Sequence, residues 1–199
     1  MSTQQAPQLG AGALDANWRG YRFAAWAGQA VLAAALVVVL MQGRFTGALT
    51  LAGFLVAALV FVTREDRLPP VFDFLFVVAA LVNAAGWVWN LFERPGPYDE
   101  IAHAYTTFAI TLALGLLAYG SLFGSFRAHR WLFMLVIASF GIAVGALWEV
   151  AEWSADKLLP ADVVSGLDDT IVDLIVDSLG ALVAGAVAVW ALGKTRAQP

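Results

Sequence analysis

Three aspartates recur every fourth residue at the start of the last hydrophobic segment: Asp169, Asp173 and Asp177. On an α-helix this spacing places them on one face, where they form an acidic stripe. With a rise of about 1.5 Å per residue, Asp177 lies roughly 12 Å beyond Asp169, inside a hydrocarbon core about 30 Å thick. Charged groups at such depth are costly and normally face the interior of a helix bundle. We therefore expect these carboxylates to have partners.

Two other apolar segments carry polar residues that could be those partners. Asp99 and His103 are one helical turn apart at the start of one segment, and Glu149 and Glu152 are three residues apart near the end of another. Since neighbouring helices alternate in direction, we expect all three groups to meet in one half of the bundle. The candidate metal ligands are His103, Glu149, Glu152, Asp173, Asp177, Asp169 and Asp99.

These residues combine six carboxyl groups with one imidazole, and such a set cannot stay fully ionised in a low dielectric without cations. A divalent metal would supply the charge, and a set that includes His suits Zn, Mn or Fe better than Ca or Mg. Two alternatives are a metal-free network of protonated and hydrogen-bonded carboxyls, and separate acids that face headgroups and water. Asp169 could also be a helix N-cap.

The composition is that of a multi-pass membrane protein. Of the 199 residues, 61% are hydrophobic and 13% charged, and the mean hydropathy is +0.77, which is too apolar for a soluble domain. The absence of cysteine excludes disulfides, thiolate metal sites and cysteine nucleophiles. No phosphate-binding loop, nucleophile elbow or zinc-protease motif is visible, and no basic stripe indicates nucleic acid.

The predicted fold class is all-α, with six transmembrane helices in one bundle. Residues 1–20 are expected to be a disordered cytoplasmic tail, residues 21–193 the transmembrane domain, and residues 194–199 a cytoplasmic tail. The predicted spans are Tyr21–Met41, Thr46–Val62, Val71–Phe92, Ile101–Phe123, Trp131–Trp153 and Thr170–Leu192.

Basic residues predict the orientation. Most of the 11 Lys and Arg residues flank the N-terminus, the C-terminus and the second and fourth loops, so both termini should be cytoplasmic. The expected location is a cell inner membrane. The acidic residues fall mainly on the outer side. Trp87 and Trp148 are interpreted as interfacial anchors near that side, and Asn83 as a residue that caps or hydrogen-bonds between helices.

Small residues indicate which helices pack closely. Gly141 and Gly145 continue in register to Glu149, while Gly180 and Ala181, followed by Ala184, continue the stripe of Asp177. Such seams let helix backbones approach one another in lipid. The fifth and sixth helices should therefore pack against each other.

Three motifs together resemble a known family. They are Tyr98-Asp99-Glu100-Ile101-Ala102-His103, Trp148-Glu149-Val150-Ala151-Glu152-Trp153, and the stretch from Gly166 to Gly180 with Asp169-Thr170 and Asp173. In this order they resemble the YjdF-like inner-membrane proteins of unknown function, and more distantly the VanZ-like proteins linked to glycopeptide resistance. The resemblance implies a site at these residues and leaves the reaction open.

Three functions are compatible with these features. The first is a metal-dependent membrane protein, acting as an enzyme on a lipid or lipid-linked substrate at the outer leaflet. The second is a non-catalytic accessory subunit or scaffold that binds a protein partner or a second copy of itself, and the third is a proton or cation transporter. Membrane lipids are expected partners in every case, and whether the protein is an enzyme stays open.

Overall fold

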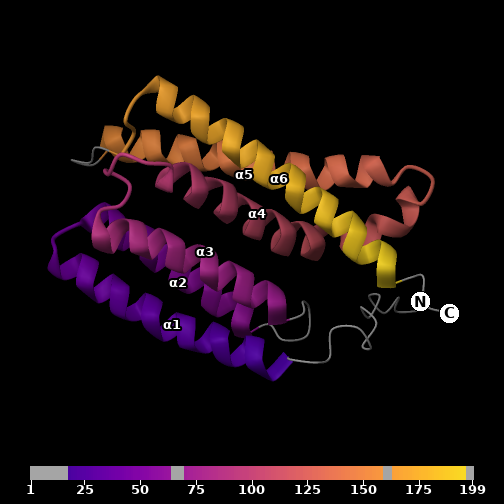
Figure 1. Cartoon of the computed structure of the whole chain (residues 1–199), viewed down its shortest axis with the longest axis horizontal. Coiled ribbons are helices and arrows are strands. Elements are labelled where there is room, and N and C mark those ends of the chain that lie inside the picture. Colours follow the sequence, from indigo (N-terminus) through magenta and orange to yellow (C-terminus); the bar gives the residue numbers. More distant parts are fainter. Residues whose placement is uncertain (1–17, 64–69, 159–162, 196–199) are drawn as a thin grey trace.

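The computed structural model describes residues 18–63, 70–158 and 163–195, and every regular element in these ranges is a helix. The long helices run antiparallel to their neighbours in sequence (Figure 1). In chain order the elements are α1 (Trp18–Met41), α2 (Phe45–Thr63), α3 (Pro70–Trp89), α4 (Tyr98–Tyr119), the 3-10 helix η2 (Gly120–Phe126), α5 (Arg130–Leu158) and α6 (Leu167–Thr195).

Five helices, α1 and α3 to α6, contain stretches long and apolar enough to cross a membrane. The remaining helix, α2, has a shorter apolar stretch, Phe45–Val60. The prediction of an all-helical membrane protein is confirmed at this level. The start of α1 and the end of α6 lie at the same end of the bundle (Figure 1).

Helix boundaries differ from the predicted spans. The first helix begins at Trp18, so residues 18–20, expected in the tail, are helical, and α6 continues to Thr195. A helix can continue past the apolar stretch because its backbone groups stay hydrogen-bonded there. Conversely, α3 ends at Trp89, where Asn90 adopts a positive φ of 56°. The predicted tails at residues 1–17 and 196–199 lie outside the described residues.

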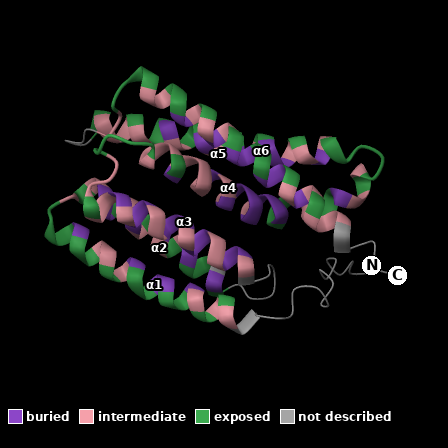
Figure 2. Cartoon of the chain, in the orientation of Figure 1, coloured by how far each residue is buried: buried purple, intermediate pink, exposed green. Residues whose placement is uncertain are grey.

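The helices form two groups of three, each with its own apolar core. Leu32, Leu51 and Val77 belong to the core of α1, α2 and α3. Phe133 and Ile137 belong to the second core, which is mainly of α4, α5 and α6 and also includes Phe72 of α3. Buried and exposed residues alternate along the long helices (Figure 2), and many of the exposed residues are apolar. Packing between α3 and α4 joins the two groups.

Glycines allow α4, α5 and α6 to approach closely. A Cβ atom on Gly145 of α5 would lie 2.5 Å from Oδ2 of Asp177, and one on Gly180 of α6 would collide with the carbonyl oxygen of Ala104 on α4. A Cβ on Gly141 would collide with the Thr111 side chain. The predicted close packing of α5 against α6 is therefore present, and α4 joins it.

Substituting these glycines should destabilise the protein. Gly180→Ala forces the backbones of α4 and α6 apart, and we expect a loss of about 1–3 kcal/mol, as for other overpacked cores. Thermal unfolding of the purified protein in detergent, followed by circular dichroism, measures this loss.

The matched control is Gly53→Ala on α2, because no atom lies within 4 Å of a Cβ built there. Alanine favours helix more than glycine does, so this variant should keep or raise the unfolding temperature. Equal unfolding temperatures for Gly180→Ala and the wild type would contradict the close approach.

Candidate functional site

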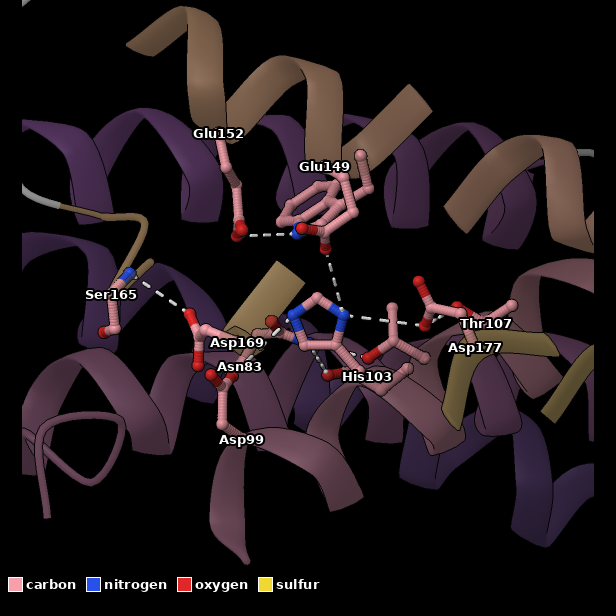
Figure 3. Close-up of polar contacts among 12 residues, drawn as sticks. Asn83, Asp99, His103, Thr107, Glu149, Glu152, Ser165, Asp169 and Asp177 are labelled. Carbon is pink, nitrogen blue, oxygen red and sulfur yellow. Dashed lines mark hydrogen bonds and ion pairs between the residues drawn. The ribbon is translucent and has the colours of Figure 1, made fainter. Parts of the chain in front are cut away.

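One face of α4 supplies the centre of the site. Asp99, His103 and Thr107 follow one another at intervals of one turn, and the start of this helix is fixed to α3 because Tyr98 donates a hydrogen bond to the carbonyl oxygen of Val82 at 2.6 Å. A carboxylate in the first turn is stabilised by the helix dipole. The polar face therefore points from α4 toward α5 and α6 (Figure 3).

His103 lies between carboxylates from all three helices (Figure 3). Its Nδ1 is 3.5 Å from Oδ1 of Asp177 and 3.7 Å from Oε1 of Glu149. On the opposite side of the ring, Nε2 is 3.7 Å from Oδ1 of Asp99. The side chain of His103 is only 9% exposed, so these charges interact with little screening by water.

Asp177 is the deepest carboxylate of the group, 2% exposed. It fits because Gly145 has no side chain at the point of contact. Thr107 donates a hydrogen bond to its Oδ1 at 2.6 Å, a short distance typical of a charged acceptor. Its Oδ2 accepts no hydrogen bond from any residue that the structure describes.

Glu149 and Glu152 reach the site from α5 (Figure 3). Glu149 is buried, 7% exposed, and its Oε1 accepts no hydrogen bond within the described ranges. Glu152 is held by the indole of Trp148, whose Nε1 donates to Oε1 at 2.8 Å. The helix thus fixes one carboxylate and leaves an oxygen of the other without a donor.

The two aspartates nearer the start of α6, Asp169 and Asp173, have different surroundings. Asp173 is buried, 3% exposed, and offers an oxygen near ligand atoms of Asp99 and His103. Asp169 accepts a hydrogen bond from the backbone N–H of Ser165 at 3.1 Å. Because α6 begins at Leu167, Asp169 lies inside the first turn and is not the N-cap residue.

The donor geometry fits a metal ion. Two sets of three ligand atoms, each within 4.8 Å of one another, share the same histidine: Asp99, His103 and Asp173 form one, and His103, Glu149 and Glu152 the other. Two bonds of about 2.1 Å at a tetrahedral angle separate their ligand atoms by about 3.4 Å. The contacts of 3.5 and 3.7 Å from Nδ1 are too long for hydrogen bonds and close to that separation.

A small void lies beside the imidazole. Its volume is about 20 Å³, and its lining includes Asn83, His103, Thr107, Trp148 and Asp177. This is room for one water molecule or one ion. Asp177, one of whose carboxylate oxygens lacks a donor among the described residues, is thus one of the residues that line this space.

A larger cavity of about 520 Å³ adjoins the site between the two helix groups. Asp99, His103 and Glu152 line it on one side, and Phe54 of α2 and Trp87 of α3 on the other. A volume of this size is typical of pockets for small molecules, which span about 300–1,000 Å³. The carboxylates and the imidazole are thus accessible to a ligand in the cavity.

The polar groups stop part of the way along the bundle. Thr111 continues the face of His103 and Thr107 and is fully buried. On α6 the residues that follow Asp177 toward the other end of the bundle on the same face are Ala181, Ala184 and Ala188, all fully buried. The described residues therefore form a pocket at one end of the bundle, with an apolar packed region beyond it.

Two tryptophans of the site, Trp87 and Trp148, were not placed there by the sequence analysis. Trp148 and Trp87 are half-buried and line the cavity, a position that their interpretation as interfacial anchors did not include. The spacing of Trp148 and Glu152, four residues apart on one helix, could have indicated their contact. The interpretation of Asn83 is confirmed, because it donates to Oγ1 of Thr106 on the neighbouring helix at 2.8 Å.

Comparisons with known proteins place the chain among uncharacterised relatives. The family model described as "Predicted membrane protein (DUF2238)" matches residues 24–194. An uncharacterised protein of Thermotoga maritima is 37% identical over 103 residues, which cover 50% of this chain and 52% of the relative. The chain thus spans about half the length of this curated relative. No solved structure matches the chain. The more distant VanZ-like resemblance stays a prediction.

Replacing Thr107 should show how much the buried carboxylate depends on its donor. Thr107→Val keeps the shape of the side chain but removes the hydroxyl that donates to Asp177, so we expect a loss of about 1–3 kcal/mol in unfolding free energy. Thr107→Ser keeps the hydroxyl and should lose less. Denaturant unfolding in mild detergent compares the two, and a Val variant as stable as the Ser variant would show that the hydrogen bond is dispensable.

Proposed function

We propose that this chain, which belongs to the DUF2238 family of predicted membrane proteins, binds a divalent transition-metal ion at the cluster around His103. The observation that carries the proposal is the buried Oε1 of Glu149, which has no hydrogen-bond donor among the described residues and lies 3.7 Å from Nδ1 of His103. An unpaired buried carboxylate is strongly unfavourable, and a metal ion would remove that cost.

The ligand types favour particular metals. One imidazole with several carboxylates suits Zn, Mn or Fe, whereas Ca and Mg prefer oxygen ligands alone. The oxygen of Glu149 without a donor favours the set of His103, Glu149 and Glu152, in which Nδ1 of His103 faces Glu149; Asp99 and Asp173 form the alternative set with His103, and Asp99 faces Nε2. Trp148 would orient Glu152, as outer partners of metal ligands commonly do.

The cavity beside the cluster supports a role on a lipid or lipid-linked substrate. Apolar residues line much of it, and the ligand candidates lie at its wall. A bound metal supplies Lewis acidity, and a carboxylate of the cluster that is not a ligand would serve as the base that accepts a proton. On the buried face of α6, the described residues beyond Asp177 include Ala181, Ala184 and Ala188, and this apolar stretch disfavours the transporter alternative with the aspartate stripe as its pathway.

We place the site at the outer side of a cell inner membrane, with α2 as a sixth crossing and both termini cytoplasmic. The distribution of Lys and Arg in the sequence supports this orientation. The first residue of α1 and the last of α6 lie at one end of the bundle, opposite to the end that holds the site, as an even number of crossings requires.

Metal content tests the proposed function. The purified wild type, loaded with Zn or Mn and dialysed, should retain stoichiometric metal by plasma mass spectrometry, whereas His103→Ala and Glu149→Gln should bind it at least about tenfold more weakly. Glu100→Gln is the control, because this neighbouring carboxylate belongs to neither ligand set. A wild type that retains no stoichiometric metal would exclude the proposal.

Cysteine labelling tests the orientation, since the chain contains no cysteine of its own. Ser165→Cys lies beside the site in the loop before α6, and Ala128→Cys lies before α5 at the opposite end; both positions are exposed. A membrane-impermeant maleimide should label Ser165→Cys in intact cells and Ala128→Cys only after permeabilisation. The reverse pattern would invert the proposed topology.

A further inference from the structure

The wall of the 520 Å³ cavity is acidic. Among the residues that line it in the described part of the chain, four carry carboxyl groups and none is Lys or Arg; the four are Glu93, Asp99, Glu152 and Asp169. Two arginines lie in nearby loops, but Arg44 donates to the carbonyl oxygen of Trp87 at 2.6 Å, and Arg94 to that of Trp89 at 3.0 Å. The cavity itself therefore offers a ligand no cationic side chain other than His103.

The negative balance persists if a metal is bound. One divalent ion balances the charge of at most two carboxylates, and three further acids of the cluster lie close to His103 of this wall: Glu149, Asp173 and Asp177. The oxygen of Glu149 that lacks a donor is 3.7 Å from His103, which lines the cavity. An anionic group such as a phosphate would be repelled here, and a cation would be attracted.

Aromatic side chains complete the lining. Phe54, Trp87 and Trp148 all line the cavity, and the rings of Phe54 and Trp148 lie 5.9 Å apart across the boundary between the two helix groups. Aromatic faces attract organic cations through their electron-rich centres, tryptophan most strongly. The same rings, with Leu49 and Ile110, provide apolar surface for the body of a ligand.

We propose that this cavity binds a lipophilic organic cation, a molecule that joins a positively charged ammonium- or phosphonium-type group to an apolar body. This inference names the ligand class of the site proposed above. Glu93 and Asp169 of the cavity wall belong to neither metal-ligand set, so the charge that they supply does not depend on a bound metal. The positive group lies toward Asp99, Glu152 and Asp169, and the apolar body lies against the aromatic side of the cavity.

Two probes of nearly the same shape and opposite charge separate this proposal from binding by apolar volume alone. Tetraphenylphosphonium should bind the wild-type protein in lipid nanodiscs saturably, with one site per chain by equilibrium dialysis. Tetraphenylborate should show no saturable binding above that of empty nanodiscs. Equal binding of the two ions, or binding of the cation no greater than to empty nanodiscs, would overturn the proposal.

Adjacent aspartates provide matched variants. Asp169 lines the cavity and Asp168 is exposed, so Asp169→Asn should weaken binding of tetraphenylphosphonium by about threefold, and Asp168→Asn should leave it unchanged. Glu93→Gln should weaken binding to a similar extent without changing metal content. Equal effects of Asp168→Asn and Asp169→Asn would indicate a general surface-charge effect and overturn the assignment to the cavity.

Metal content measured in the same preparations separates the two proposals. Metal uptake without binding of the cation would overturn this inference and leave the metal centre standing. Binding of the cation without metal uptake would support the cavity proposal and exclude the metal.

Discussion

The cost of burying charge governs the design of this protein. Asp173 and Asp177 on α6 and Glu149 on α5 are almost fully buried in a bundle whose outer surface is apolar, where ionised groups cannot face lipid without a large penalty. The imidazole of His103 lies among them, yet one ring supplies at most one positive charge. The local structure serves this arrangement: Gly145 leaves room for Asp177, Thr107 donates to it, and hydrogen bonding fixes Glu152.

The division into two groups of three helices creates the cavity beside this charge. Because α1 to α3 and α4 to α6 each pack around a core of their own, space remains between the groups at the end where the acids gather. Toward the other end, alanines on α6 allow tight packing and close the bundle. The result is a polar pocket that opens at one end of the bundle. This architecture is typical of a binding site and not of a transport pathway.

Much of this arrangement follows from periodicity. The four-residue spacing of Asp169, Asp173 and Asp177 determines one helical face, and the glycines of α5 and α6 indicate which helices approach each other. Hydropathy indicates the helices themselves. These signals are local or depend on one helix at a time, so a single sequence carries them.

The periodicity of the sequence could not predict the cavity or the positions of the aromatic residues that line it. Tryptophans near the ends of apolar segments are usually interfacial, and only the packing of α2 against the second group shows that Trp148 meets Phe54. The extra turns of α1 and α6 are likewise invisible to hydropathy, because polar residues can continue a helix beyond the apolar stretch. Which ring nitrogen of His103 faces which carboxylate depends on helix rotation, which periodicity leaves undefined.

The central claim is that a metal ion binds through the single imidazole of His103, and X-ray absorption spectroscopy at the metal edge tests it most directly. The chain has two histidines, and the other, His129, is exposed, so the wild type loaded with Zn should show a nitrogen and oxygen shell at about 2.0–2.2 Å with the outer-shell scattering of one imidazole. That scattering should persist in His129→Ala. A spectrum with no imidazole contribution, or one that loses it in His129→Ala, would contradict the account.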